Sequence, residues 1–292
     1  MGHHSGDGLK GHEDDFCSSF IVMRSTRACL ARFWAQRSLL RKLAYREVVG
    51  RYRGSMLGLL WSFVTPLVLL AVYTLVFSGV FNAQWTDARS SGKAGFALIL
   101  FAGLIVFTFV ADCLNRAPTL ILTHANYVKK VVFPLEILPL AVTVGALFHA
   151  LISILALILI GMLIGEIATL SGLFWMPLIL LPIIIYVLGM SWLLASLGVF
   201  VRDVGQAVGL VTTVLMFASP VFYPLSALPD GVRFWLSLNP LAYTIEDLRN
   251  VLLFGASPHL LTWSVHLLLS LLVARVGLLW FQRTRGGFAD VM

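Results

Sequence analysis

Six long runs of mostly apolar residues follow one another along the chain, separated by shorter polar segments. A helix rises about 1.5 Å per residue, so roughly 20 apolar residues cross a bilayer core of about 30 Å. The polar gap after residue 200 separates two runs because Arg202 and Asp203 are costly to bury in lipid. The pattern predicts six transmembrane helices, over residues 59–81, 96–114, 135–163, 173–200, 204–223 and 260–281.

Composition points the same way. Of the 292 residues, 59% are apolar and only 12% are charged, whereas a soluble domain carries about 25% charged residues. The net charge of +7 does not indicate a nucleic-acid ligand, because the basic residues lie beside the apolar runs and form no compact basic module. We therefore expect an all-α membrane protein.

The positions of Lys and Arg predict the orientation. Sixteen of the 21 fall in segments on the same side as the amino terminus, and four fall on the other side: Arg89, Lys93, Arg233 and Arg249. Cytoplasmic segments are enriched in these residues, so both termini of this multi-pass membrane protein are predicted to be cytoplasmic. Arg275 lies inside the last run, where its side chain either snorkels to the cytoplasmic interface or lines a polar pathway.

The segment before the first run is amphipathic. Leu40, Leu43, Ala44 and Val48 recur at helical spacing, with basic residues elsewhere on the helical wheel. Residues 21–58 are therefore predicted to form an interfacial helix, or alternatively a solvated stretch that only sets topology. Residues 1–20 are rich in Gly, His, Asp and Ser and are expected to be a disordered leader. Residues 59–292 form the third predicted region, one six-span domain.

A longer polar segment, residues 224–257, separates the last two runs and contains several prolines. We expect one or two short amphipathic helices there, dipping toward the bilayer as an outer gate. Their apolar positions are Leu241, Ile245, Leu248 and Leu252, and the polar residues offset from them are Glu246, Asp247, Arg249 and Asn250.

No ATP site is encoded in the sequence. A phosphate-binding loop ends in Gly-Lys-Ser or Gly-Lys-Thr, but the Gly92-Lys93 pair is followed by Ala94, and Asp87 holds the earlier glycine position. His149 and His266 stand singly in apolar runs, where a hydrogen-bonded packing role competes with a ligand role. We therefore expect that this chain is not an enzyme and holds no cofactor or metal of its own.

Several short motifs occur in a fixed order along the chain. They are Arg51-Tyr52-Arg53-Gly54-Ser55, Asn126-Tyr127-Val128-Lys129-Lys130, Phe133-Pro134-Leu135-Glu136, Arg202-Asp203, Pro220-Val221-Phe222-Tyr223-Pro224, Asn239-Pro240-Leu241 and Phe288-Ala289-Asp290-Val291. With these motifs, residues 46–292 resemble the permease subunit of type 2 ABC exporters, in the branch that exports O-antigen, capsule and teichoic-acid polysaccharides. The resemblance implies a homodimer bound to two copies of a nucleotide-binding ATPase subunit, which holds ATP and Mg.

The resemblance also implies the inner (plasma) membrane as location and a polyprenyl-pyrophosphate-linked polysaccharide, O-antigen-like, as substrate. Tyr73, Phe77 and Phe81 recur every four residues and could line a channel for sugar rings, or simply pack against lipid and helices. Arg51 and Arg53 are placed to receive the lipid pyrophosphate, or only to anchor the chain among headgroups.

A cytoplasmic segment, residues 115–134, is the expected contact with the ATPase. We interpret His124, Asn126, Tyr127, Lys129 and Lys130 as an ATPase-coupling segment; the alternative is a positive-inside anchor. Before it, Asp112 and Arg116 are four residues apart, a spacing that favours an ion pair on one helix. Pro224, Asn239, Pro240 and Leu241 mark the predicted outer gate.

Two other functions are compatible with parts of the pattern. A type 2 ABC permease for a drug or lipid would share the six spans and the missing ATP site. A membrane glycosyltransferase would need clustered acidic residues for metal and nucleotide sugar, whereas Asp112 and Asp203 stand apart.

Overall fold

The structure is a computed structural model that describes residues 36–73, 75–76, 93–128, 133–167, 171–225 and 228–291. Helices are the only regular secondary structure in these ranges, which confirms the predicted all-α class. The chain divides into a unit that ends at Leu43 and a larger unit from Ala44 to Met292. The predicted leader, residues 1–20, lies outside the described residues.

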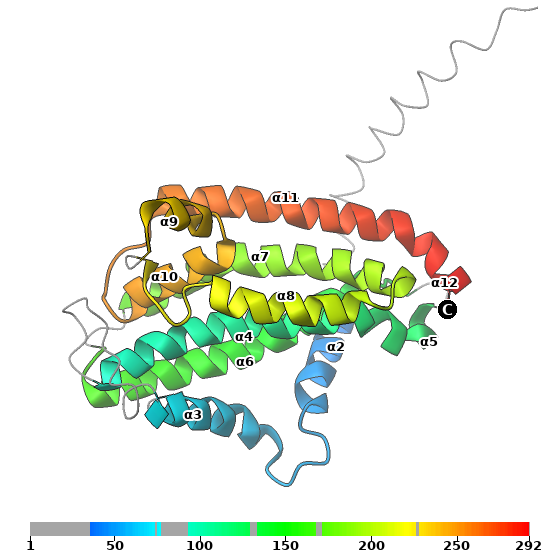
Figure 1. Cartoon of the computed structure of the whole chain (residues 1–292). Helices are drawn as coiled ribbons and strands as arrows, with labels where there is room; N and C mark the ends of the chain where they lie inside the picture. Colours follow the sequence, from blue (N-terminus) through cyan, green and yellow to red (C-terminus); the bar gives the residue numbers. More distant parts are fainter. Residues whose placement is uncertain are drawn as a thin grey trace, which may run out of the picture. The chain divides into compact units, whose positions relative to one another are not determined.

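Within the described ranges, four helices are long and apolar enough to cross a membrane (Figure 1). They are α4 (Lys93–Thr123), α6 (Ile137–Ile164), α7 (Ser171–Phe200) and α11 (Leu260–Thr284), and they fall on the second, third, fourth and sixth predicted spans. Two apolar helices of 13 and 15 residues, α3 (Trp61–Tyr73) and α8 (Val204–Ala218), fall on the first and fifth. Short 3-10 turns, η1 (Gly58–Leu60) and η4 (Arg285–Gly287), precede α3 and follow α11, and α12 (Phe288–Val291) comes last.

The predicted end of the fifth span is wrong. We expected a helix to residue 223, but α8 ends at Ala218. Ser219 precedes Pro220, whose ring excludes the helical conformation from the residue before it. Ser219 accordingly has extended angles, with φ of −111° and ψ of 152°.

The second span was predicted too short. α4 continues past Leu114 and through Pro118 to Thr123, over residues that we expected in a cytoplasmic loop. Pro118 removes one helical hydrogen bond, but packing against a neighbouring helix compensates for such a loss. Gly198 of α7 lies directly on the Pro118 carbonyl, where any Cβ atom at residue 198 would overlap it.

Helix α4 is the centre of the larger unit and packs against α3, α6, α7, α8 and α10. A second close pair is formed by α7 and α11, where a Cβ atom at Gly189 would lie only 2.5 Å from the Cα atom of Ala274. Small residues permit such close approach between helices in lipid. The outward faces of α6, α8 and α11 expose large apolar side chains, among them Leu159, Leu210 and Leu268. Lipid is the solvent that suits these faces.

Two short helices, α9 (Asp230–Ser237) and α10 (Pro240–Leu252), form in the segment where we predicted one or two. The Asn239 side chain caps α10 by accepting a hydrogen bond from the Leu241 backbone N–H at 3.0 Å, and Pro240 occupies the first turn. The expected polar face of α10 is wrong, however. Asp247 and Arg249 are only 4% and 2% exposed, because α10 packs against both α4 and α7 and has little surface left for water.

The buried Arg249 side chain joins three parts of the fold. Its guanidinium group donates to the backbone carbonyls of Ile99, Pro220 and Val221, at 2.9, 2.6 and 2.7 Å. These carbonyls belong to the first turns of α4 and to the turn that follows α8. Burial lowers the pKa of Arg249 to about 10, partly offset by the Glu246 carboxylate at 3.6 Å, so the side chain remains a cation at neutral pH.

Space for this side chain comes from Gly103. A Cβ atom at that position would lie 2.5 Å from Nη2 of Arg249. A larger residue at position 103 would therefore overlap the guanidinium group, which cannot move away because three carbonyls hold it.

We expect Arg249→Met to lower the free energy of unfolding by about 3–5 kcal/mol, the usual cost of breaking a buried charged network. The three carbonyls would lose their donor while remaining buried. Denaturation in detergent micelles, followed by circular dichroism, measures the change. As a control, Glu246→Gln should cost no more than about 1 kcal/mol because Glu246 is partly exposed. Equal stability of Arg249→Met and the unchanged protein would contradict the anchoring role.

Candidate functional site

A polar cavity of about 890 Å³ lies beside the carboxyl-terminal half of α2 (Arg37–Gly50). The other walls come from the last turns of α4 and from α5 (Ala125–Val128), a single turn. Its lining residues are Arg46, Glu47, Gly50, Arg51, Asp112, Arg116, Thr123, His124, Asn126 and Tyr127. The cavity therefore brings together one predicted lipid-pyrophosphate residue and three of the predicted coupling residues.

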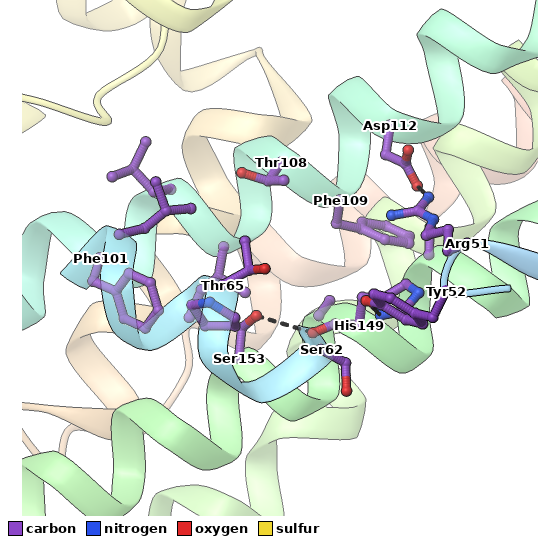
Figure 2. Close-up of a pocket in the computed structure, with 16 residues that line it drawn as sticks. Arg51, Tyr52, Ser62, Thr65, Phe101, Thr108, Phe109, Asp112, His149 and Ser153 are labelled. Atoms are coloured by element: carbon purple, nitrogen blue, oxygen red, sulfur yellow. Dashed lines mark hydrogen bonds and ion pairs between the residues drawn. The ribbon is translucent and has the colours of Figure 1, made fainter. Parts of the chain in front are cut away.

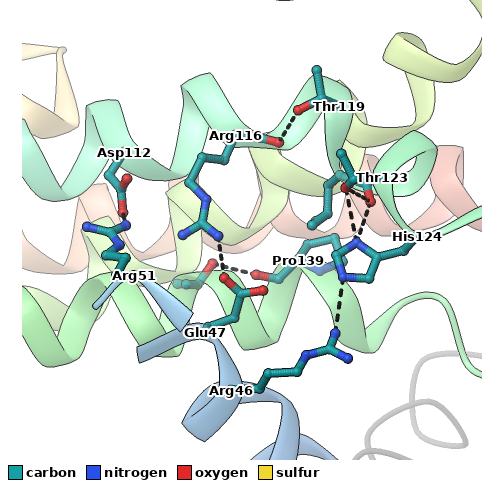
Figure 3. A network of polar contacts seen from close by, with 11 residues as sticks. Arg46, Glu47, Arg51, Asp112, Arg116, Thr119, Thr123, His124 and Pro139 are labelled. Carbon is teal, nitrogen blue, oxygen red and sulfur yellow. Dashed lines mark hydrogen bonds and ion pairs between the residues drawn. The ribbon is translucent and has the colours of Figure 1, made fainter. Parts of the chain in front are cut away.

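Two ion pairs cross this cavity (Figure 3). Arg51, which follows α2, pairs with Asp112 of α4. Arg116 of α4 pairs with Glu47 of α2. All four side chains are between 13% and 35% exposed, so each charge is partly withdrawn from water and needs a partner.

The predicted pair between Asp112 and Arg116 is wrong in this structure. Both residues do lie in the carboxyl-terminal half of α4, but each reaches a charge on or next to α2. Pairing along α4 would leave Glu47 and Arg51 partly buried without a counter-ion. Crossing between elements satisfies all four charges, and it fixes the second half of α2 against α4.

Arg46 connects α2 to the predicted coupling segment. Its Nη1 donates to the Tyr127 hydroxyl at 2.9 Å, and Nη2 lies 3.1 Å from Nε2 of His124. Nδ1 of His124 lies 2.9 Å from the Leu120 carbonyl. Since a carbonyl can only accept, the ring proton sits on Nδ1 and Nε2 is free to accept from Arg46.

Aromatic stacking extends this contact. The Tyr127 ring stacks on Phe133, with centroids 4.3 Å apart and an interplanar angle of 9°, and on His124 at 5.7 Å. Asn126 is exposed beside the cavity. Lys129 and Lys130 lie outside the described residues, so their coupling role stays a prediction.

A second cavity, of about 330 Å³, lies between α3, α4 and α6 (Figure 2). It shares Arg51 and Asp112 with the first cavity and adds Tyr52 and His149 at the same end. The Tyr52 hydroxyl lies 3.3 Å from Nδ1 of His149. Burial raises the pKa of Tyr52, partly opposed by Arg51, so the phenol keeps its proton and can donate it to Nδ1. Nε2 of His149 then carries the ring proton.

The two histidines of the apolar runs therefore differ. His266 stacks on the Tyr243 ring with centroids 4.4 Å apart and is 3% exposed, as a packing residue would be. His149 lines a cavity, and its Nε2 has no hydrogen-bond partner among the described residues. The sequence offered no way to separate them, since each stands alone among apolar residues.

The other predicted site residues do not gather at these cavities. Arg53 is exposed in the turn after α2. Tyr73 is the last residue of α3, and Phe77 and Phe81 lie outside the described residues, so the aromatic channel lining remains a prediction.

At the predicted gate, Asn239 also donates to the Ser219 hydroxyl at 3.3 Å, which ties α10 to the end of α8. Pro240 and Leu241 are buried and Pro224 is partly buried.

Sequence reasoning missed the two residues of α2 that carry most of these contacts, Arg46 and Glu47. A signal did exist for Glu47, because it is the one acidic residue between Arg37 and Arg53. A single acidic residue in a basic amphipathic helix is better explained by an ion pair than by contact with anionic headgroups, which would repel it.

Comparison with known proteins gives consistent results. The profile of the ABC-2 type transporter family matches residues 38–253. An O-antigen export system permease protein of Myxococcus xanthus is 29% identical over 261 residues, covering 87% of this chain and 95% of that protein. One from Klebsiella pneumoniae is 25% identical with the same coverage, and a capsule polysaccharide export inner-membrane protein of Neisseria meningitidis is 24% identical over 73% of this chain and 78% of its own.

The family profile spans most of the chain, including nearly all of α2, three of the four long apolar helices (α4, α6 and α7), and α10. It covers every residue of the two cavities. The chain belongs to the ABC-2 type transporter family of membrane permeases.

Proposed function

We propose that this chain is the transmembrane subunit of an ATP-driven exporter that moves a lipid-linked, O-antigen-like polysaccharide from the cytoplasmic to the outer face of the inner membrane. The names of the relatives, which export O-antigen and capsule polysaccharides, support this substrate class. The cavities beside α2 support it independently, since they combine arginines suited to phosphate with an apolar interior.

The proposed topology has six spans and two cytoplasmic termini. In it, α3 and α8 cross the membrane together with the four long helices. Support comes from the distribution of Lys and Arg and from the exposed Arg202-Asp203 turn between α7 and α8. We further propose that α9 and α10 form an outer gate and that Tyr73, Phe77 and Phe81 line the pathway.

Energy is proposed to come from a separate nucleotide-binding subunit that binds ATP and Mg, with α5 as its contact. The observation that carries this proposal is the Arg46 side chain, which bonds both His124 and Tyr127 at the coupling segment. The next turn of the same chain holds Arg51 beside Asp112. Movement of α5 would therefore act on the segment proposed to receive the lipid substrate.

Assembly as a homodimer is proposed to use α8. In this helix only Val208 and Thr212 are buried, and the other residues are half-buried or exposed. Gly205 and Gly209 lie on it with open space in front of their Cα atoms. Glycines four residues apart on an apolar helix allow a second helix to approach closely.

Removing the contact between Arg46 and Tyr127 should uncouple transport from ATP hydrolysis. Tyr127→Phe keeps the stack on Phe133 but loses a hydrogen bond to a charged group, worth about 1.5–3 kcal/mol, so we expect export to fall roughly tenfold. Surface glycan is measured on whole cells, and ATPase activity on the purified complex in liposomes. ATP hydrolysis should continue.

Tyr45→Phe is the matched control, because Tyr45 lies on the same helix and is 70% exposed. It should leave export unchanged. Arg46→Met should lose at least as much export as Tyr127→Phe, because it also removes the contact with His124. Adding Tyr127→Phe to Arg46→Met should cause no further loss, since the hydrogen bond between the two residues is already gone. Undiminished export in Tyr127→Phe, with the ATPase subunit bound, would refute the coupling role.

Charge reversal at Arg51 and Arg53 should weaken binding of the lipid-linked glycan by at least roughly tenfold, because two phosphate-binding cations become anions. Binding is measured on the purified complex with polyprenyl-pyrophosphate-linked glycan. Arg283→Glu, at an exposed position in the last turn of α11, controls for net charge. Stimulation of the ATPase by a drug or phospholipid but not by the glycan would instead favour a drug or lipid permease.

A further inference from the structure

The cavity between α3, α4 and α6 has an interior suited to an apolar chain. Its inner walls are Leu69, Phe101, Leu104, Ile105 and Phe109. Two hydroxyl groups on its lining are already satisfied, since Ser62 donates to the Leu59 carbonyl at 2.7 Å and Ser153 to the His149 carbonyl at 3.0 Å. At about 330 Å³ the cavity is near the lower end of the range for ligand pockets, about 300–1,000 Å³. It fits a slender chain better than a bulky ring system.

One end of this cavity is polar (Figure 2). Arg51, Tyr52, Asp112 and His149 gather there, away from Phe101. The Arg51 and Asp112 side chains are 33% and 22% exposed, and both also line the larger polar cavity. Nε2 of His149 adds a donor without a partner among the described residues. An apolar slot that ends in an arginine and a free N–H donor is complementary to a lipid chain that ends in phosphate.

Asp112 occupies the position that such a phosphate would need. A partly exposed ion pair is weak because water competes with it. A diphosphate carries more charge and more acceptor oxygens than a carboxylate, and the planar guanidinium group matches phosphate oxygens in a bidentate manner. When the lipid is present, its phosphate is therefore a better partner for the Arg51 guanidinium group than the Asp112 carboxylate is.

We infer that this cavity binds the phosphate-proximal part of a single-chain lipid carrier. In the absence of the lipid Asp112 pairs with Arg51, and the arriving lipid phosphate displaces the Asp112 carboxylate from the guanidinium group. The inference rests on the proposed function, because it takes the carrier to be the polyprenyl diphosphate that bears the glycan. It adds a binding site for the carrier chain, and it assigns to Asp112 the role of competing with the lipid phosphate for Arg51.

The displaced Asp112 has a second partner within reach. Arg116 lies one helical turn further along α4, at the spacing that favours an ion pair, and is now held by Glu47 of α2. Pairing with Asp112 would take Arg116 away from Glu47. Arrival of the lipid would thus loosen α2, whose Arg46 contacts the coupling segment.

The test is a binding titration by native mass spectrometry on the purified complex with its ATPase subunit. The probes are glycan-free polyprenyl diphosphate, the corresponding polyprenol, and phosphatidylglycerol. In Asp112→Asn we expect the dissociation constant of polyprenyl diphosphate to fall roughly three- to tenfold, because a competing partly exposed carboxylate is removed. In Arg51→Gln it should rise at least roughly tenfold.

Three further variants sharpen the result. Asp290→Asn, which removes an exposed carboxylate on α12, is the charge control and should not change affinity. Ala150→Leu fills the slot without adding charge and should weaken binding several-fold. In the Arg51→Gln background, where residue 51 has no guanidinium group for Asp112 to occupy, Asp112→Asn should give no gain.

Unchanged or weaker binding in Asp112→Asn would overturn the inference, as would equal binding of the polyprenol. Binding of phosphatidylglycerol as tight as that of polyprenyl diphosphate would assign the cavity to membrane phospholipid instead. Because the probes carry no glycan, these outcomes are separate from the proposed function. That function fails if deleting this chain leaves polysaccharide export intact, whatever the titration gives.

Discussion

A charged side chain inside an apolar helical protein can be buried only if other groups replace the water it has lost. Arg249 satisfies this requirement with three backbone carbonyls from two separate parts of the chain. The constraint also works in the other direction. Because the guanidinium group must be held, the start of α4, the turn after α8 and helix α10 are held together, and Gly103 has to remain without a side chain.

The same constraint organises the opposite end of α4. Arg51 and Glu47, in and after α2, take their counter-ions from α4, so the second half of an amphipathic helix is fixed by charge rather than by apolar packing alone. Arg46 then extends the connection to His124 and Tyr127. One short stretch of chain thereby contacts the proposed ATPase-coupling segment and the proposed lipid site, and export requires communication between these two places.

Much of the fold follows from apolar length. Helices α7 and α11 begin and end close to the predicted boundaries because their flanks are polar or charged, as at Arg202 and Asp203. The errors have local or tertiary causes. α8 ends early because Pro220 acts on Ser219, a signal present in the sequence, whereas α4 runs on through Pro118 because Gly198 of α7 packs there.

Hydrophobic length and charge position are properties of the chain alone, so the all-helical class, the places of the apolar helices and the residue types at the candidate site follow from the amino-acid sequence. The pairing of the charges depends on how the helices fold together. Spacing on α4 favours Asp112 with Arg116, but the choice depends on which other charges are partly buried nearby, and Glu47 and Arg51 are brought there by folding. Asp247 and Arg249, polar in sequence and buried in space, have the same explanation: burial depends on what packs against a helix, and the helix's own periodicity does not contain that information.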